Sequence, residues 1–316
     1  MRFPRIAGLA LGLGLMPWML FGQVTIEPRP RPPAKTDTLP PATIRVTTNL
    51  VLVPVSVNDP LNRPVSGLER ENFRVFEDKV EQKITSFAMD DEPVAVGLVF
   101  DTSGSMGEKL RRSRMAAKEF FRTANPEDEF FLVEFDDRPR LEVELTSDTG
   151  TIENQLTFSR SHGSTALLDA IYMALHEMHK SKKNKKALLV ISDGGDNNSR
   201  YTAAEVRRVL VESDVLIYAI GVFGGGSTPE EAGGPSLLSH IAEQTGGRMF
   251  EANVVDLPDT AKRIGIELRN RYVIGYSSSN PARDGKYRHI QVVLAPPRGL
   301  PKLQAHWRTG YNAPSE

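Results

Sequence analysis

The chain has 316 residues, a formal net charge of −1 and no cysteine. This length can bury a sizeable core and favours two domains. A charge close to zero provides no overall basic field to attract nucleic acid. The lack of cysteine excludes disulfides, a thiol nucleophile, cysteine-ligated zinc and lipid attachment at a lipobox cysteine.

Residues 1–22 have the pattern of a secretory signal peptide. Arg2 and Arg5 give it a basic start, and the apolar stretch at 6–21 is somewhat short for a membrane span, which usually takes about 20 residues. We therefore expect export to the periplasm, the cell envelope or the extracellular space, with an uncleaved membrane anchor as the alternative. Residues 23–42 are rich in proline and lack periodicity, which predicts an extended linker.

Residues 43–93 are expected to form an all-β segment. Strands are predicted where β-branched residues recur with rough alternation, at 44–46, 50–57, 73–76 and 83–87. Glu77-Asp78-Lys79 separates the last two strands and is predicted to be a tight turn. These strands are too few to close a good core alone.

Between residues 94 and 270 the pattern changes to strands that alternate with helices. The predicted strands are at 94–100, 130–135, 187–192, 215–222 and 248–250. Apolar stripes at helical spacing predict helices between them, and Thr202 with Glu205 forms a capping box at one helix start. Short apolar strands that alternate with helices predict a doubly wound, mostly parallel α/β sheet covered on both faces.

Strands return at 271–313, where they are predicted at 272–276, 287–294 and 304–308. Asp284-Gly285, between the first two, is a hairpin-turn signal. The order β, α/β, β favours one small β-sandwich that is built from both ends of the chain and carries the α/β domain as an insertion. Two separate small β modules would give the same order.

Three loops of the α/β domain carry oxygen-bearing side chains next to predicted strands or helix starts. These residues are Asp101, Ser103, Ser105, Thr165 and Asp193. In an open parallel sheet, the carboxyl edge of the strands is where ligands bind. Each residue alone has the ordinary alternative of a helix N-cap. Together they supply oxygen ligands that suit Mg²⁺, Mn²⁺ or Ca²⁺ rather than zinc or copper.

The motif Asp101-x-Ser103-x-Ser105, followed by Thr165 and Asp193, resembles the metal-ion-dependent adhesion site (MIDAS) of von Willebrand factor type A domains. Across 94–270 the chain is similar to bacterial versions of this domain, and its flanking strands resemble Acidobacterial proteins in which β segments bracket it. The resemblance implies a Rossmann-like fold in which the three hydroxyls are ligands and the two carboxylates lie near the ion, directly or through water. It also implies that a partner's Glu or Asp completes the shell.

We therefore expect an exported, metal-dependent protein-binding module for adhesion or assembly, and not an enzyme. The expected cofactor is Mg²⁺, with Mn²⁺ or Ca²⁺ as alternatives, and the expected partner is a protein that offers an Asp or Glu. Nucleic acid is not expected as a partner, and a membrane only if the signal segment stays uncleaved. The alternatives are a structural envelope module whose metal only stabilises the fold, and a hydrolase. A hydrolase would need a general base near Asp193, for which neither His162 nor Asp196 is convincing.

Three further features have simpler interpretations. The Lys-rich run at 180–186 follows a predicted helix end, where cations are favourable and solvated. The glycine-rich stretch at 223–235 is expected to be a surface loop or, alternatively, an adjustable rim that selects the partner. The predicted helix at 256–270 runs straight into the strand at 272–276. A helix shift of the kind implied by the family resemblance would therefore pass directly into the sandwich.

Overall fold

The computed structural model describes residues 50–90, 92–223, 229–253, 255–297 and 299–315. The predicted signal peptide, the proline-rich linker and the strand expected at 44–46 lie outside these residues. All described elements belong to one compact unit, which spans residues 47–316. Within the described ranges, no helix is long and apolar enough to cross a membrane.

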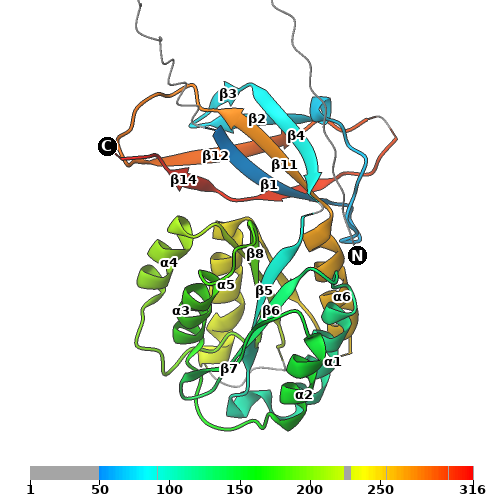
Figure 1. The fold of residues 1–316 in the computed structure, drawn as a ribbon, viewed down its shortest axis with the longest axis vertical. Coiled ribbons are helices and arrows are strands. Elements are labelled where there is room, and N and C mark those ends of the chain that lie inside the picture. The colour runs from blue at the N-terminus through cyan, green and yellow to red at the C-terminus, as the bar shows by residue number, and fades with distance from the viewer. Residues whose placement is uncertain (1–49, 91, 224–228, 254, 298, 316) are drawn as a thin grey trace, which may run out of the picture. The chain divides into compact units, whose positions relative to one another are not determined.

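A six-stranded sheet forms the centre of the α/β domain (Figure 1). Its order is β10 (Met249–Glu251), β9 (Val215–Gly221), β8 (Lys185–Ser192), β5 (Val94–Asp101), β6 (Glu129–Phe135) and β7 (Pro139–Thr146). All neighbours are parallel except β7, which runs antiparallel to β6. Every residue of β5 and β9 is buried because both faces of the sheet are covered, which explains why both strands are apolar except for Asp101 at the end of β5.

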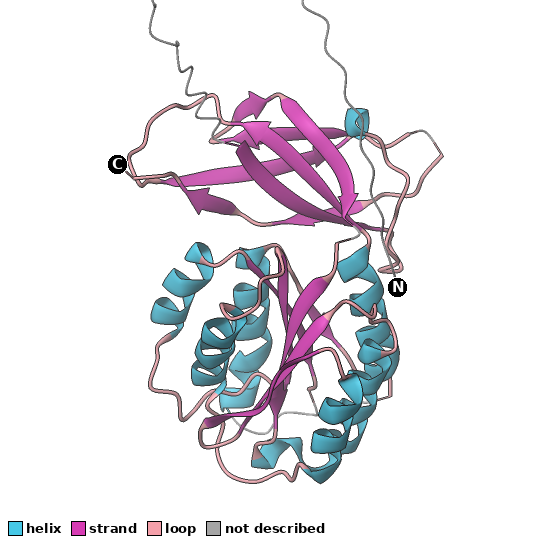
Figure 2. Cartoon of the chain, in the orientation of Figure 1, coloured by secondary structure: helices cyan, strands magenta, loops and turns pink. Residues whose placement is uncertain are grey.

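Helices cover both faces of this sheet (Figure 2). One layer contains α1 (Leu110–Phe121), α2 (Thr149–Phe158) and α6 (Leu257–Arg269), and the other contains α3 (Leu167–Met178), α4 (Ala203–Glu212) and α5 (Pro229–Thr245). Alternation along β5 divides its side chains between the two layers. Val96 and Leu98 pack with the first layer, whereas Ala95 and Val99 pack with the second. The predicted doubly wound α/β sheet is confirmed.

Two four-stranded antiparallel sheets form a β-sandwich from both ends of the chain. One has the order β13 (Gln304–Trp307), β1 (Leu50–Asn58), β11 (Arg271–Ser277), β4 (Ile84–Asp90), and the other β14 (Gly310–Asn312), β12 (Tyr287–Leu294), β2 (Phe73–Glu77), β3 (Val80–Gln82). Their shared core joins Val53 and Val75 from the N-terminal segment to Tyr272 and Ile290 from the C-terminal segment. A single sandwich is therefore present, and the alternative of two separate β modules is wrong.

Several local expectations differ from the structure. The hairpin predicted at Asp284-Gly285 is wrong, because β11 and β12 belong to different sheets and the chain crosses between them. The glycine-rich loop expected at 223–235 is wrong for its second half, because α5 begins at Pro229, and residues 224–228 lie outside the described ranges. The tight turn between β2 and β3 is confirmed, with positive φ angles of 47° at Asp78 and 71° at Lys79.

Candidate metal centre

The predicted ligands lie where the strand order of the α/β sheet reverses. From β5 the chain first adds β6 on one side and later β8 on the other. Asp101 is the last residue of β5, and Asp193 directly follows β8, the neighbouring strand. In doubly wound sheets, this reversal opens the crevice in which ligands bind. The two carboxylates therefore share the position at which the fold favours a ligand.

Hydrogen bonds hold the carboxylate of Asp101 in place without neutralising it. Its Oδ1 accepts a 2.8 Å hydrogen bond from the backbone N–H of Ser103, and its Oδ2 accepts a 2.6 Å bond from the hydroxyl of Ser192. Both Asp101 and Asp193 are buried. Burial, followed by the charge of Asp193, raises the pKa of Asp101 to about 7. A cation at this edge would offset both effects and favour the charged carboxylate.

The two serines of the first loop face each other rather than cap a helix. Their hydroxyl oxygens lie 3.1 Å apart. Ser103 precedes the 3-10 helix η2 (Gly104–Lys109), but its side chain makes no capping hydrogen bond there. By contrast, Asp148 caps α2, and Thr202 caps α4 in the predicted capping box. The N-cap alternative is therefore not realised for Ser103.

Thr165 lies in a second loop that is tied to both of the others. Its backbone N–H donates a 2.9 Å hydrogen bond to Oδ1 of Asn197, and Gly104 donates a 3.0 Å bond to the carbonyl of Gly163. The start of α3 is capped by Oδ1 of Asp196, so the hydroxyl of Thr165 is not needed as a cap. Among the described residues, this hydroxyl makes no hydrogen bond with the other four predicted ligands.

Lys109 also belongs to this site, although its sequence context does not predict it. Its Nζ lies 3.1 Å from Oδ2 of Asp193, and the two side chains are 13% and 2% exposed. The lysine is the last residue of η2, four residues beyond Ser105. That spacing is the available signal, although only the fold brings the side chain to Asp193.

The donor set is rich in hydroxyls and poor in carboxylates. Within the described ranges, no three His, Cys, Asp or Glu side chains are grouped so that they could hold a metal ion. The cluster instead combines two carboxylates with hydroxyl oxygens, which suits a hard divalent cation that keeps part of its shell for water or another ligand. The residues present therefore fit a MIDAS-type ion better than a zinc or copper ion.

The side chains considered as general bases have structural partners. Nδ1 of His162 lies 3.2 Å from Oδ2 of Asp136, which also forms an ion pair with Arg140. Asp196 accepts the backbone N–H of Leu167 at 3.0 Å and the hydroxyl of Ser199 at 2.6 Å. These contacts give no support to the hydrolase alternative.

Fold and loop cluster together define a doubly wound α/β domain with buried carboxylates and hydroxyl side chains at one edge of its sheet. In agreement, residues 96–195 match the family model described as von Willebrand factor type A domain. This part of the chain is thus similar to a von Willebrand factor type A domain. No curated protein matches the chain.

Solved structures with similar folds are distant in sequence. An aerotolerance-related membrane protein from Bacteroides fragilis is 17% identical, with 55% of this chain and 98% of that chain covered and a TM-score of 0.46. The von Willebrand factor domain of the pilus tip protein Mfa5 from Porphyromonas gingivalis is 15% identical over 56% and 95%, with a TM-score of 0.46. A von Willebrand factor type A protein from Catenulispora acidiphila is 14% identical over 85% and 74%, with a TM-score of 0.49.

Proposed function

We propose that this chain is an exported protein-binding module in which a divalent cation at the carboxyl edge of the α/β sheet captures a carboxylate of a partner protein. The observation that supports this most is the buried pair Asp101 and Asp193, next to the facing hydroxyls of Ser103 and Ser105. Export is part of the proposal and rests on the signal-like pattern of residues 1–22.

Ser103, Ser105 and Thr165 would hold the cation through their hydroxyls, and Asp101 and Asp193 would hold it directly or through water. Mg²⁺ is the proposed ion, with Mn²⁺ or Ca²⁺ as alternatives. The bound ion would supply a positive charge that neutral hydroxyls leave largely uncompensated. An incoming Asp or Glu carboxylate is therefore strongly attracted to the ion, whereas an ion surrounded by carboxylates would attract it much less because their negative charges repel it.

A thermal-unfolding titration of the wild-type chain with Mg²⁺, Mn²⁺ and Ca²⁺ tests the metal site. A ligand that binds only the native state raises the melting temperature by mass action. We expect a rise that saturates in the wild type and is lost in Asp101→Ala. Ser105→Ala gives a second variant at an exposed position, in case removal of the buried carboxylate impairs folding. The matched control is Asp259→Ala, an exposed aspartate in the first turn of α6.

Partner capture is tested separately, with an immobilised peptide that carries one glutamate and a matched peptide with glutamine. We expect the glutamate peptide to bind in Mg²⁺ and to be released by chelator, and the glutamine peptide to stay unbound. A metal-dependent melting temperature without any difference between the peptides would favour the structural envelope module. Absence of a melting-temperature rise with all three ions would contradict the metal site itself.

A further inference from the structure

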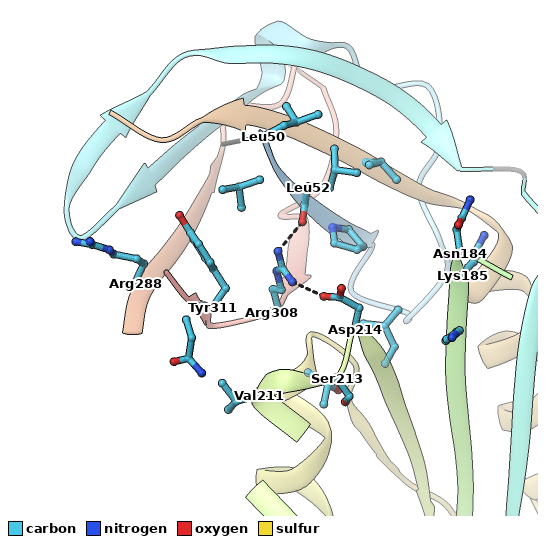
Figure 3. A pocket seen from close by; sticks show the side chains of 18 of the residues that line it. Leu50, Leu52, Asn184, Lys185, Val211, Ser213, Asp214, Arg288, Arg308 and Tyr311 are labelled. Carbon is cyan, nitrogen blue, oxygen red and sulfur yellow. Dashed lines mark hydrogen bonds and ion pairs between the residues drawn. The ribbon is translucent and has the colours of Figure 1, made fainter. Parts of the chain in front are cut away.

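A cavity lies at the opposite edge of the α/β sheet from the metal loops. Its volume is about 1000 Å³, and it is bounded by the outer face of β1 and β11 and by the amino ends of β8 and β9 (Figure 3). Leu52 and Val273 line it from the sandwich side, and Lys185 and Asp214 from the α/β side. The proposed metal centre contributes no residue to this lining, so the cavity needs its own explanation.

Two buried cations of the lining share one carboxylate. Nζ of Lys185 and Nη2 of Arg271 lie 3.1 and 3.2 Å from the same oxygen, Oδ2 of Asp90. Their side chains are 3% and 4% exposed, so solvent screens them poorly. Burial and the neighbouring charge of Arg271 lower the pKa of Lys185 to about 8. This corner of the cavity therefore carries one positive charge more than its carboxylate balances.

The arginines of the lining also keep donors that no described residue accepts. Nε and Nη1 of Arg271 and Nε of Arg308 are buried without a hydrogen-bond partner in the described part of the chain. The other donors of Arg308 are used, because Nη1 bonds Asp214 at 2.8 Å and Nη2 bonds the carbonyl of Leu52 at 2.9 Å (Figure 3). Buried donors are normally paired. An anion that accepts from Arg271 would satisfy this rule.

The rest of the cavity wall includes exposed apolar side chains. Leu50, Leu52 and Met89 are 50%, 46% and 41% exposed, and all three line the cavity. Alternation along β1 buries Val51 and Val53 in the sandwich core and leaves the leucines on the outer face. Large aliphatic side chains that line a concave surface are typical of a ligand-binding site, because burial of their apolar area by a ligand is favourable.

We propose that this cavity binds a small amphiphilic anion, whose carboxylate or phosphate group pairs with Arg271 and Lys185 and whose apolar body lies along Leu50 and Leu52. The excess positive charge selects the anionic group, and the exposed leucines select the apolar body. An inorganic anion would pair with the cations but would not cover the leucines, and an uncharged apolar molecule would cover the leucines but would not pair with the cations.

Isothermal titration of the full chain with octanoate, below its micelle concentration and in the presence of chelator, tests the proposal. We expect saturable binding of one octanoate per chain, with acetate and 1-octanol each bound at least about tenfold more weakly. Octyl phosphate and inorganic phosphate are titrated in the same way. The first decides between carboxylate and phosphate as the preferred group, and the second shows whether the apolar body is required.

Variants locate the binding within the cavity. Arg271→Gln removes a cation, and Leu52→Glu adds a carboxylate at a half-exposed position. Both should weaken octanoate binding at least about tenfold, whereas Arg283→Gln, at an exposed arginine outside the lining, should leave it unchanged. If Arg271→Gln does not fold, Leu52→Glu decides alone. Absence of octanoate binding, or equal binding by wild type and variants, would overturn the proposal. Asp101→Ala should bind octanoate normally, so this site and the metal site fail independently.

Discussion

Nζ of Lys109 lies 3.1 Å from Oδ2 of Asp193, so an ammonium group of the chain itself contacts a carboxylate of the proposed metal centre. Both side chains are largely buried, which keeps their interaction from being screened by solvent. A divalent ion at this edge must share Asp193 with the lysine or displace it. The lysine therefore influences how tightly the proposed centre holds its ion.

Replacing Lys109 by methionine should tighten metal binding. The change removes a positive charge that competes for Asp193, and we expect the Kd for Mg²⁺ to fall about tenfold, which corresponds to about 1.4 kcal/mol. Isothermal titration of Lys109→Met against wild type measures the change. Lys262→Met, at an exposed lysine on α6, is the matched control. An unchanged or larger Kd for Lys109→Met would contradict the competition.

Lys185 should make stability depend on pH in the alkaline range. Its pKa is lowered to about 8 in the native state from the ordinary lysine value of 10.5, which applies to the unfolded chain. Below pH 8 both states bind the proton, and the native state bears the full penalty of a buried charge. Between pH 8 and 10.5 the unfolded state binds more protons, so native stability rises with pH, by up to about 3 kcal/mol.

Urea unfolding of wild type and Lys185→Met at about pH 7.5, 9 and 10.5 measures this effect across the range in which the two states differ in bound protons. The free energy of unfolding of the wild type should rise relative to that of the variant across the series. Lys182→Met, at an exposed lysine of the same run, should follow the wild type at every pH. Parallel curves for wild type and Lys185→Met would show that the buried lysine is not the source.

Gly194 should not tolerate a side chain. Its φ angle is +79°, and an added Cβ would meet Cα of Gly234 at 2.6 Å. We expect Gly194→Ala to lower the free energy of unfolding by about 1–3 kcal/mol and to weaken metal binding, because Asp193 must move with it. Urea unfolding and metal titration are the measurements. Gly233→Ala, in α5 with open space around its Cβ, should be neutral or slightly stabilising. Equal losses in both variants would refute the steric argument.

Removal of one partner of the buried ion pair between Arg248 and Glu267 should strongly lower the free energy of unfolding. Glu267 is 1% exposed and accepts hydrogen bonds from Arg248 and from the hydroxyl of Tyr218. Arg248→Met leaves this carboxylate buried without its cation, so we expect a loss of about 3–5 kcal/mol in the free energy of unfolding. The double variant Arg248→Met with Glu267→Leu should recover part of the loss. Urea unfolding measures the free energies. If the loss in the double variant equals the sum of the losses in the two single variants, Arg248 and Glu267 do not interact energetically.

Elements with a strong periodic signal could be predicted from the sequence. The apolar runs that became β5, β8 and β9 are buried on both faces, so their composition alone identifies them. β7 was missed although Leu141, Val143 and Leu145 alternate with charged residues. As an antiparallel edge strand it is only partly buried, and its polar content resembles a loop. α2 was missed because only Ile152 and Leu156 of it are buried.

The site residues also divide into those with a local sequence signal and those without one. The positions of Asp101 at the end of β5 and of Asp193 directly after β8 could be predicted from local sequence. Lys109 and Lys185 could not, because their partners lie far away in the chain. The lysine run at 180–186 is expected to be solvated, but Lys185 is buried, so that expectation is wrong for this residue. A charge pattern does not reveal which lysine a distant carboxylate will bury.

The pairing of Asp90 with Arg271 has a consequence for how such a chain can be built. These residues stand opposite each other at the ends of β4 and β11, which are antiparallel neighbours. β4 and β11 are thus paired like the two strands of a hairpin, and the whole α/β domain is inserted in the chain between them. A tight turn of about two residues could bridge that end and leave the sandwich hydrogen bonds intact. The α/β domain is thus an insertion at one position of the sandwich, between two neighbouring strands, and the strand order of the sandwich does not depend on which chain segment joins them.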